Sequence, residues 1–530
     1  MHARHERIAR AAAWVRANAT ILAIAAVGCV WIVPVQYLGW NQGAHYALVR
    51  ALANGTPYVD RTRFEVGKGG MADDGTGDLS FIDGHYYAAK SPGLAFTVLP
   101  PYLLLKAAGG AAPIRESRPE VWYLQLFGAL LPALVLLLLV SSTGDSLERG
   151  FGTAAAVTLG LSTMVLPFAT MLFSHVLSAT LVFAAFVVLL HERRGPPRPA
   201  TVALAGLLAG LAVTAEFPVA LVGAIVCLYA VARRPLLPRL GAYAAGALAG
   251  VLPALLFNLW AFGNPLTFSY ANVVGSQDAN RRGLFGITAP DFRTFVELLF
   301  SPIGLLVLTP VVLAGAVGLV LVYLRGHRLE AAVAGAVVVF YLVLNAGYET
   351  PFGGNSPGPR FLVATLPFLA LGLAAAYRSF PLTTAALAVC SGVEMVVLTL
   401  TNPLGVDDRA WFHRFATGQF VETVTDLLGI GHGVALFFVA LAAAAGLGVL
   451  ATAKPLLGLE DAARAVLAVV GWIVLARRAP GVLDDHGPWA ALGLAGAVAL
   501  GVVLVPVALL LAGRRAGGLR PGVRRSSPGR

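Results

Sequence analysis

Residues 120–140 read EVWYLQLFGALLPALVLLLLV, a run in which Glu120 is the single charged side chain. A helix that crosses the hydrocarbon core of a bilayer needs about 20 predominantly apolar residues. This stretch meets that requirement, and comparable runs recur along the whole chain. The sequence therefore predicts a protein that crosses a membrane many times.

The composition of the 530-residue chain leads to the same conclusion. Apolar residues make up 58% and charged residues 12%, and the mean hydropathy is +0.77. Soluble domains have about 25% charged residues, so this chain has too little polar surface for a water-soluble globule. The three cysteines (Cys29, Cys227 and Cys390) lie inside apolar runs, which does not indicate a disulfide framework.

Fourteen apolar segments are predicted to be membrane-spanning helices. They are 18–38, 120–140, 151–169, 171–190, 200–216, 217–232, 240–262, 303–324, 330–346, 361–377, 381–400, 433–453, 464–477 and 488–512. The first is expected to be a signal anchor, because no small-residue cleavage site follows its long apolar run. The predicted fold class is thus an all-α polytopic integral membrane protein.

The distribution of charge predicts the orientation, and one further apolar run, 91–108, decides how the loops alternate. If this run does not span, 22 of the 38 Lys and Arg residues but only about 7 of the 27 Asp and Glu residues lie on the side of both termini. An excess of Lys and Arg marks the cytoplasm. We therefore expect cytoplasmic termini and long outer loops. The run 91–108, interrupted by Pro100 and Pro101, is expected to lie at the interface or to re-enter the membrane.

These predictions divide the chain into four parts. Residues 1–17 form a cytoplasmic N-terminus, 18–380 the main transmembrane module with its outer loop 39–119, 381–512 the C-terminal spans, and 513–530 a basic cytoplasmic tail. Long loops in compact proteins are usually functional. The outer loop is therefore the first candidate for a functional site.

The first part of the outer loop predicts a short helix. His45, Leu48, Val49 and Leu52 repeat at helical spacing, which is typical of an amphipathic helix at a membrane surface.

The second part of the outer loop concentrates ionisable and aromatic residues. Asp78 and Asp83 precede the stretch GHYYAAKSPG at 84–93, which contains His85, Tyr86, Tyr87 and Lys90. Unused charge is costly next to an apolar run, so these residues are candidates for a site. A solvated acidic loop is the alternative, and it is the preferred interpretation for Asp73 and Asp74.

Three further polar residues stand at the outer ends of predicted spans. Arg360 follows the stretch GGNSPGP at 353–359, and His175 and Glu216 lie near the ends of two other spans. An Arg can hold a phosphate through two parallel hydrogen bonds, and ionisable groups at membrane depth are functional candidates. The alternatives are a snorkelling Arg at the interface and structural hydrogen bonds for His175 and Glu216.

Several chemistries have no signature in the sequence. There is no GxxxxGK[ST] loop, no HExxH helix and no CxxC pair. No soluble segment is large enough to bind a nucleotide-sugar, so an energy-rich donor must come from the membrane or from outside. No cofactor is predicted with certainty. A divalent metal stays open through the carboxylates and His of the outer loop, although no ligand spacing indicates one.

The order of elements over residues 18–380 resembles the polytopic glycosyltransferases of the GT-C superfamily, which include protein O-mannosyltransferases, lipid A aminoarabinose transferases and the bacterial RgtA/B/C/D-like group. The shared features are a first span, a long outer loop with surface helices, a Lys-x-Pro segment and short basic cytoplasmic loops. The KSPG stretch at 90–93 is similar to the family's Lys-Pro-Pro segment, whose Lys meets the lipid phosphate. The motifs around Asp78, Lys90 and Arg360 indicate a separate bacterial subgroup.

The sequence departs from this family at two positions. The family carries an acidic residue just after the first span as its catalytic carboxylate, and this sequence has Asn41-Gln42 there. The family's second acidic position, at the outer end of the third span, appears here as His175. A neutral amide cannot act as a general base. Either the role has moved to Asp78 or Asp83, which is the expectation, or this branch of the family works differently.

The resemblance implies an inverting glycosyltransferase of the bacterial inner (plasma) membrane. It would transfer a sugar from a polyprenyl-phosphate donor to a glycan, lipid or protein acceptor on the extracytoplasmic side, with no nucleic-acid partner. Asp78 or Asp83 is expected to be the base, supported by His85, and Lys90 and Arg360 are expected to bind the phosphate. The other expected substrate-binding residues are Tyr86, Tyr87, His175 and Glu216. A lipid-linked-sugar transporter or flippase and a non-catalytic lipid-binding membrane subunit stay open as alternatives.

Overall fold

The structure is a computed structural model, and it describes residues 33, 39–62, 77–110, 119–274, 282–283, 286–404, 410–431 and 458–517, with side chains of the last helix as far as residue 504. Two predicted spans, 18–38 (apart from residue 33) and 433–453, lie outside the described residues, as do Asp73 and Asp74.

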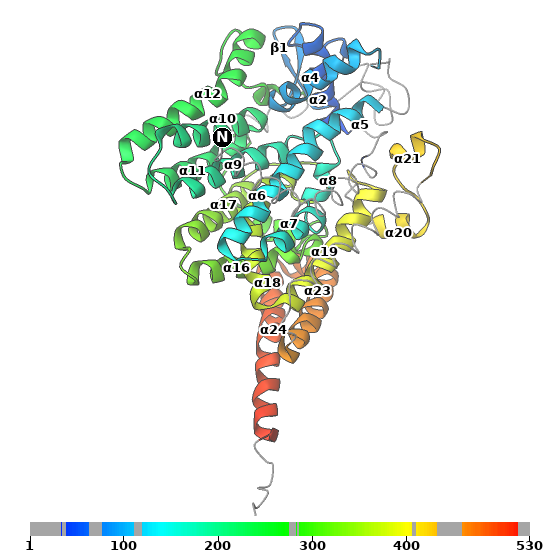
Figure 1. Cartoon of the computed structure of the whole chain (residues 1–530). Helices are drawn as coiled ribbons and strands as arrows, with labels where there is room; N and C mark the ends of the chain where they lie inside the picture. The colour runs from blue at the N-terminus through cyan, green and yellow to red at the C-terminus, as the bar shows by residue number, and fades with distance from the viewer. Residues whose placement is uncertain are drawn as a thin grey trace, which may run out of the picture.

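Helices make up most of the described chain (Figure 1). The first half contains α2 (Trp40–Ala53), β1 (Leu79–Ile82), β2 (His85–Ala88), α4 (Gly93–Ala107), α5 (Pro119–Gln125), η1 (Leu126–Leu130), α6 (Leu131–Leu147), α7 (Gly152–Leu161), α8 (Val165–Ala169), α9 (His175–Glu192), α10 (Pro199–Ala215), η2 (Phe217–Val219), α11 (Ala220–Val231) and α12 (Leu236–Phe262). The second half contains η3 (Ser269–Asn272), α14 (Phe292–Phe300), α15 (Leu305–Leu308), α16 (Val311–Leu324), α17 (Arg328–Ala346), η4 (Arg360–Thr365), α18 (Leu366–Ser379), α19 (Pro381–Thr401), α20 (Trp411–Ala416), α21 (Val424–Leu427), α23 (Leu459–His486) and α24 (Pro488–Gly517).

Seven helical segments of the described chain are long and apolar enough to cross a membrane. They are Pro119–Leu147, His175–Glu192, Leu236–Phe262, Arg328–Ala346, Arg360–Ser379, Pro381–Thr401 and Leu459–His486. Each coincides with a predicted span, and four other predicted spans (151–169, 200–216, 217–232 and 488–512) form shorter apolar helices. The prediction of an all-α polytopic membrane protein is confirmed, while the number fourteen and the domain boundaries stay predictions.

The predicted span 303–324 is not one straight helix. The segments Phe292–Leu308 and Val311–Leu324 meet at an angle of 90° around Pro310. Proline lacks a backbone N–H and disfavours a helical conformation in the residue before it. The Val311 N–H at the start of α16 donates instead to the Ser391 hydroxyl on α19, at 3.0 Å.

The outer loop also differs from its prediction. The helix expected at 41–52 is present as α2, but most of its residues are buried, so it is not an amphipathic helix on a surface. The reason is that α4 and the strand pair β1–β2 pack around it, and Tyr46, Leu48 and Leu94 share one apolar cluster. The run 91–108 forms the continuous helix α4 through both of its prolines, and its C-terminal half is mostly exposed.

Strands β1 and β2 form an antiparallel hairpin, pairing Leu79 with Ala88 and Ile82 with His85. Its two-residue turn is Asp83-Gly84, and both residues have positive φ, at 49° and 86°. That geometry is the type I′ turn that Asp-Gly favours, since its twist matches the twist of paired strands.

Close backbone contact joins α10 to α12. Gly206 and Gly210 on α10 face Gly246 and Gly250 on α12, and a Cβ on any of the four would come within 2.3 Å of a backbone oxygen of the other helix. Small residues four apart let membrane helices approach closely and gain packing energy. This contact fixes α10, whose C-terminal end carries Glu216.

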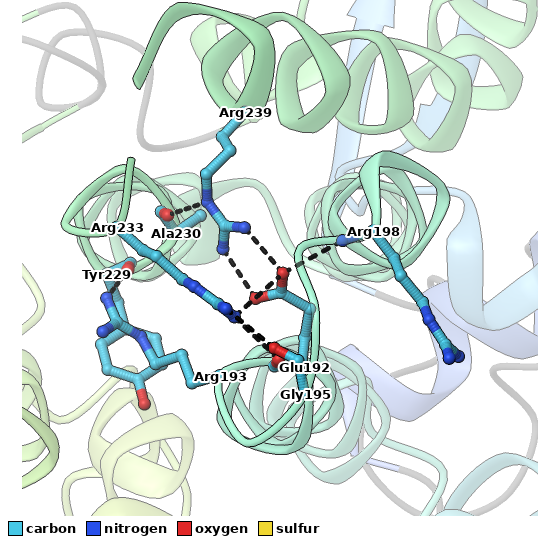
Figure 2. Close-up of polar contacts among 8 residues, drawn as sticks. All are labelled: Glu192, Arg193, Gly195, Arg198, Tyr229, Ala230, Arg233 and Arg239. Atoms are coloured by element: carbon cyan, nitrogen blue, oxygen red, sulfur yellow. Dashed lines mark hydrogen bonds and ion pairs between the residues drawn. The ribbon is translucent and has the colours of Figure 1, made fainter. Parts of the chain in front are cut away.

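A buried ion pair lies at the C-terminal end of α9, whose last residue is Glu192. Figure 2 shows the Glu192 carboxylate facing the Arg239 guanidinium, with bidentate bonds of 2.7 and 2.8 Å. Arg233 lies 3.4 Å from the same carboxylate, and the backbone N–H of Arg198 donates to it at 3.3 Å. These arginines join the ends of α9, α10 and α12 on the side predicted to be cytoplasmic.

Replacing Arg239 is expected to destabilise the protein. Arg239→Ala would leave Glu192 buried, at a cost of about 2–3 kcal/mol, which is below the value of roughly 3–5 for a fully broken buried pair because Arg233 remains. A lower midpoint of thermal unfolding in detergent would be the readout. Arg198→Ala is the matched control, because its exposed side chain points away from the carboxylate (Figure 2) and its backbone N–H is kept.

The predicted orientation can be tested with single cysteines at two exposed residues, Asn355 and Gly195. In a background without the three native cysteines, Asn355→Cys should react with an impermeant thiol reagent added outside intact cells. Gly195→Cys should react only after the membrane is opened. The reverse pattern would invert every loop assignment made from charge.

Candidate functional site

The centre of the candidate site is an ion pair between two residues of the outer loop. The Lys90 Nζ lies 2.8 Å from Asp78 Oδ2. Asp78 directly precedes β1, and Lys90 follows shortly after β2. The Lys90 side chain is 8% exposed and that of Asp78 27% exposed. The hairpin turn thus brings together two predicted site residues that are twelve positions apart.

Close packing holds the stretch at 90–93 against the end of α10. A Cβ on Gly93 would lie 2.5 Å from the backbone oxygen of Thr214, so only glycine fits there. The Phe217 N–H donates to the Ser91 hydroxyl at 3.3 Å. The Lys90 segment and the Glu216 segment are therefore held as one unit.

The ion pair changes the pKa values of both partners. Burial alone would raise the pKa of the Asp78 carboxyl, but the Lys90 ammonium and the more distant Arg360 outweigh it, and the pKa is lowered. Burial lowers the pKa of Lys90, and Asp78 opposes that shift. Asp78 therefore stays ionised, and its charge offsets part of the effect of burial on Lys90, whose pKa remains lowered.

A second pair joins the two residues predicted at the ends of spans. His175 Nδ1 lies 2.8 Å from Glu216 Oε1, and the Ser178 hydroxyl donates to Glu216 Oε2 at 2.7 Å. His175 begins α9, and Glu216 directly follows α10. Both residues are buried, and the other ring nitrogen, His175 Nε2, has no hydrogen-bond partner within the described part of the chain.

Arg360 supplies the second cation of the site. The backbone at 353–359 folds around it: Gly353 has a φ of 82°, and a Cβ there would lie 2.3 Å from Arg360 Nε. The guanidinium lies 5.8 Å from the ring centroid of Phe173 and 5.3 Å from that of Phe361. Its buried Nε has no hydrogen-bond partner, and no carboxylate forms an ion pair with Arg360, among the residues that the structure describes.

Shared neighbours show that these groups form one site. The His175 ring lies 5.7 Å from Phe173 and 5.9 Å from Phe361, the same two rings that contact Arg360. Arg360 acts electrostatically on both Asp78 and Glu216, and Glu216 acts on Lys90. Lys90, Asp78, Arg360, His175 and Glu216 are called the outer cluster below.

His45 also belongs beside the outer cluster, although the sequence suggested no chemical role for it. It is 1% exposed, and neither ring nitrogen has a hydrogen-bond partner in the described structure. Burial, followed by the charge of Lys90, lowers the pKa of His45 to about 3, so the ring is neutral. The available signal was its position, one helical turn after Asn41 on the same helix.

Asn41 and Gln42, which replace the acidic position expected from the resemblance, are both buried at the start of α2. The Gln42 side-chain oxygen accepts from the Leu172 N–H at 3.0 Å and from Gln125 Nε2 at 3.5 Å. Asn41 Oδ1 has no hydrogen-bond partner in the part of the chain described. Gln42 thus ties α2 to the segment before α9.

Four other predicted site residues lie on the hairpin and outside the outer cluster. Asp83 is exposed in the turn, and His85 pairs with Asp60 at 2.6 Å instead of with Asp78. Tyr87 donates to the Ala261 oxygen at the end of α12, at 3.0 Å. The Tyr86 ring packs against that of Phe81, with 4.8 Å between the centroids and an interplanar angle of 55°.

The described residues contain no preformed metal site, because no three of their His, Cys, Asp or Glu side chains are placed to hold one ion.

Comparisons with known proteins give similarities of fold. No family model matches the chain, and no curated protein sequence is significantly similar to it. Among solved structures, ArnT from Cupriavidus metallidurans bound to undecaprenyl phosphate aligns with a TM-score of 0.46 and 15% identity, over 96% of this chain and 81% of that one. An Archaeoglobus fulgidus oligosaccharyltransferase in its apo form aligns with a TM-score of 0.40 and 13% identity, over 89% of this chain and 59% of that one. The function proposed next rests on this chain's own residues.

Removing the Asp78 charge is expected to shift the pH range in which Lys90 can bind an anion. Asp78→Asn removes the group that raises the pKa of Lys90, so the ammonium should lose its proton at a lower pH than in the wild type. Binding of a polyprenyl phosphate, the ligand expected from the sequence, should then fall at a lower pH when it is measured from pH 6 to 10. The control is Asp484→Asn, an exposed carboxylate on α23, which should leave the profile unchanged.

Proposed function

We propose that this chain is a membrane glycosyltransferase that transfers a sugar from a polyprenyl-phosphate donor to an acceptor on the extracytoplasmic side. The observation that carries the proposal is the proximity of two cations from segments far apart in the sequence, the buried Lys90 and the half-buried Arg360. Arg360 has a buried Nε without a hydrogen-bond partner and no ion-pair partner among the described residues. Removing part of a cation from water without a counter-charge is costly. An anionic ligand would remove that cost.

The chemistry of the two cations suits a lipid phosphate. The Lys90 ammonium has three protons, of which Asp78 takes one, so two remain for an anion. The Arg360 guanidinium is held by the surrounding backbone and presents a planar set of donors. When the bond between sugar and phosphate breaks, negative charge grows on the phosphate, and preorganised cations stabilise it.

The placement of the charges favours a transferase over the transporter alternative. A transporter is expected to carry essential charges deep in several spans. In the outer cluster, Lys90 and Asp78 come from the outer loop, while His175, Glu216 and Arg360 stand at the ends of helices. The non-catalytic lipid-binding alternative predicts the same phosphate contacts without turnover.

A panel of labelled undecaprenyl-phosphate sugars, presented to the purified protein in liposomes, separates the three functions. Release of undecaprenyl phosphate is expected for a transferase. Movement of intact donor across the bilayer would instead identify a transporter, and saturable binding alone would identify a lipid-binding subunit.

Lys90 and Arg360 are expected to bind the same phosphate. Charge-assisted hydrogen bonds contribute roughly 1.5–3 kcal/mol each, so Lys90→Ala and Arg360→Ala should each weaken donor binding by about 10- to 150-fold. Residues that contact the same phosphate do not contribute independently to its binding. The double variant should therefore lose less binding free energy than the sum of the losses in the two single variants. Dissociation constants for undecaprenyl phosphate test this.

Exposed cations provide the controls for this comparison of single and double variants. Lys106→Ala on α4 and Arg293→Ala on α14 remove the same charges outside the outer cluster and should bind as the wild type does. Normal binding by both single variants would contradict the proposal, and strict additivity would assign the two cations to different groups.

A further inference from the structure

The proposed reaction needs a base for the acceptor hydroxyl, and the carboxylates expected for that role are unsuited by their surroundings. Asp78 is committed to Lys90, which lowers its pKa and hence its basicity. Asp83 is exposed in the hairpin turn, and His85 is paired with Asp60. The base must therefore come from another residue of the outer cluster or its surroundings.

His175 has the arrangement that a general base requires. Its Nδ1 faces the Glu216 carboxylate at 2.8 Å, which fixes that nitrogen as the donor and leaves the lone pair on Nε2. Glu216 is itself fixed by the Ser178 hydroxyl at 2.7 Å. The Nε2 atom is buried and has no protein partner among the described residues, so it is the open end of a carboxylate–imidazole pair.

His45 is the other buried imidazole near the outer cluster, and it lacks this support. Neither of its ring nitrogens has a partner in the described structure, and burial lowers its pKa to about 3. A ring that so strongly resists protonation is a poor proton acceptor near neutral pH. His175 differs because Glu216 would stabilise the imidazolium that proton uptake creates.

We propose that His175, oriented by Glu216, is the general base that removes the proton from the acceptor hydroxyl; this rests on the glycosyltransferase function proposed above. His175 and Arg360 contact the same two rings, those of Phe173 and Phe361. The base and the phosphate-binding cation therefore lie within one site, as a single displacement requires.

The acceptor O–H bond breaks and its proton goes to His175 Nε2, while the oxygen forms a bond to the anomeric carbon of the donor sugar. The bond between that carbon and the phosphate oxygen breaks, and its electron pair leaves with the phosphate. Lys90 and Arg360 hold the departing phosphate, and Glu216 stabilises the His175 imidazolium until its proton passes to solvent.

An acceptor without a proton tests this role directly. Azide is already an anion, so its attack on the donor needs no base. With an undecaprenyl-phosphate sugar that the wild type turns over, His175→Gln should lose transfer to hydroxyl acceptors, including water, by about 10²–10⁴-fold. Transfer to azide, measured as glycosyl azide, should stay within a few-fold of wild type, as should binding of undecaprenyl phosphate.

Two matched variants separate the base from other roles. Lys90→Ala should lose hydroxyl and azide transfer alike, because phosphate departure is common to both reactions. Glu216→Gln should resemble His175→Gln with a smaller loss, since Gln still accepts a hydrogen bond but no longer offsets the positive charge of the ring.

Each result decides the proposal. Full hydroxyl transfer by His175→Gln would overturn it, and so would an equal loss of azide and hydroxyl transfer, which would make His175 a structural or phosphate-site residue. If His175→Gln fails to bind undecaprenyl phosphate, Glu216→Gln decides by the same comparison. A wild type that releases no undecaprenyl phosphate with any donor would instead refute the glycosyltransferase function itself.

Discussion

Charge buried at the edge of an apolar helical array must be compensated, and this constraint organises the outer cluster. Lys90 is compensated by Asp78, and Glu216 by a hydrogen-bonded imidazole and a hydroxyl. Arg360 rests on aromatic rings without a carboxylate of its own in the described chain. The cost of that arrangement in the free protein is a reason to expect an anion there. The proposed affinity for a phosphate and the incomplete compensation of the cluster are thus two aspects of one feature.

The position of the site depends on packing far from any charge. Facing glycines fix α10 against α12, and the C-terminal end of α10 then meets Gly93 through a contact that excludes any Cβ. The contact at Gly93 therefore fixes the outer-loop segment that carries Lys90 against two closely packed apolar helices. A loop built in this way can hold Lys90 within hydrogen-bonding distance of its partners, a requirement for stabilising charge that develops during a reaction.

Sequence reasoning predicted the helices because apolar length is a strong signal, and it placed Lys90, Asp78, Arg360, His175 and Glu216 near one face from charge and position. It did not predict which residues pair. The His175–Glu216 and His85–Asp60 contacts depend on how α9, α10 and the outer loop fold together, which no local pattern encodes.

Three features of the fold were not predicted from the sequence. The hairpin was missed although Asp83-Gly84 is a strong turn signal. The 90° bend at Pro310 was hidden by the uniform apolarity of 303–324. α2 resembled a surface helix because burial of its polar face depends on distant partners.

The hairpin of the outer loop has neighbours at both edges. The Val59 N–H donates to the Tyr86 oxygen on one side, and on the other Ser80 bridges Val273 while the Val274 N–H donates to Leu79. An exposed strand edge is the usual template for capturing an extended peptide through backbone hydrogen bonds. At these positions the template is already occupied by the chain itself. If an acceptor binds here, whether glycan, lipid or polypeptide, it would be distinguished at these paired positions by its side groups and shape and not by strand pairing.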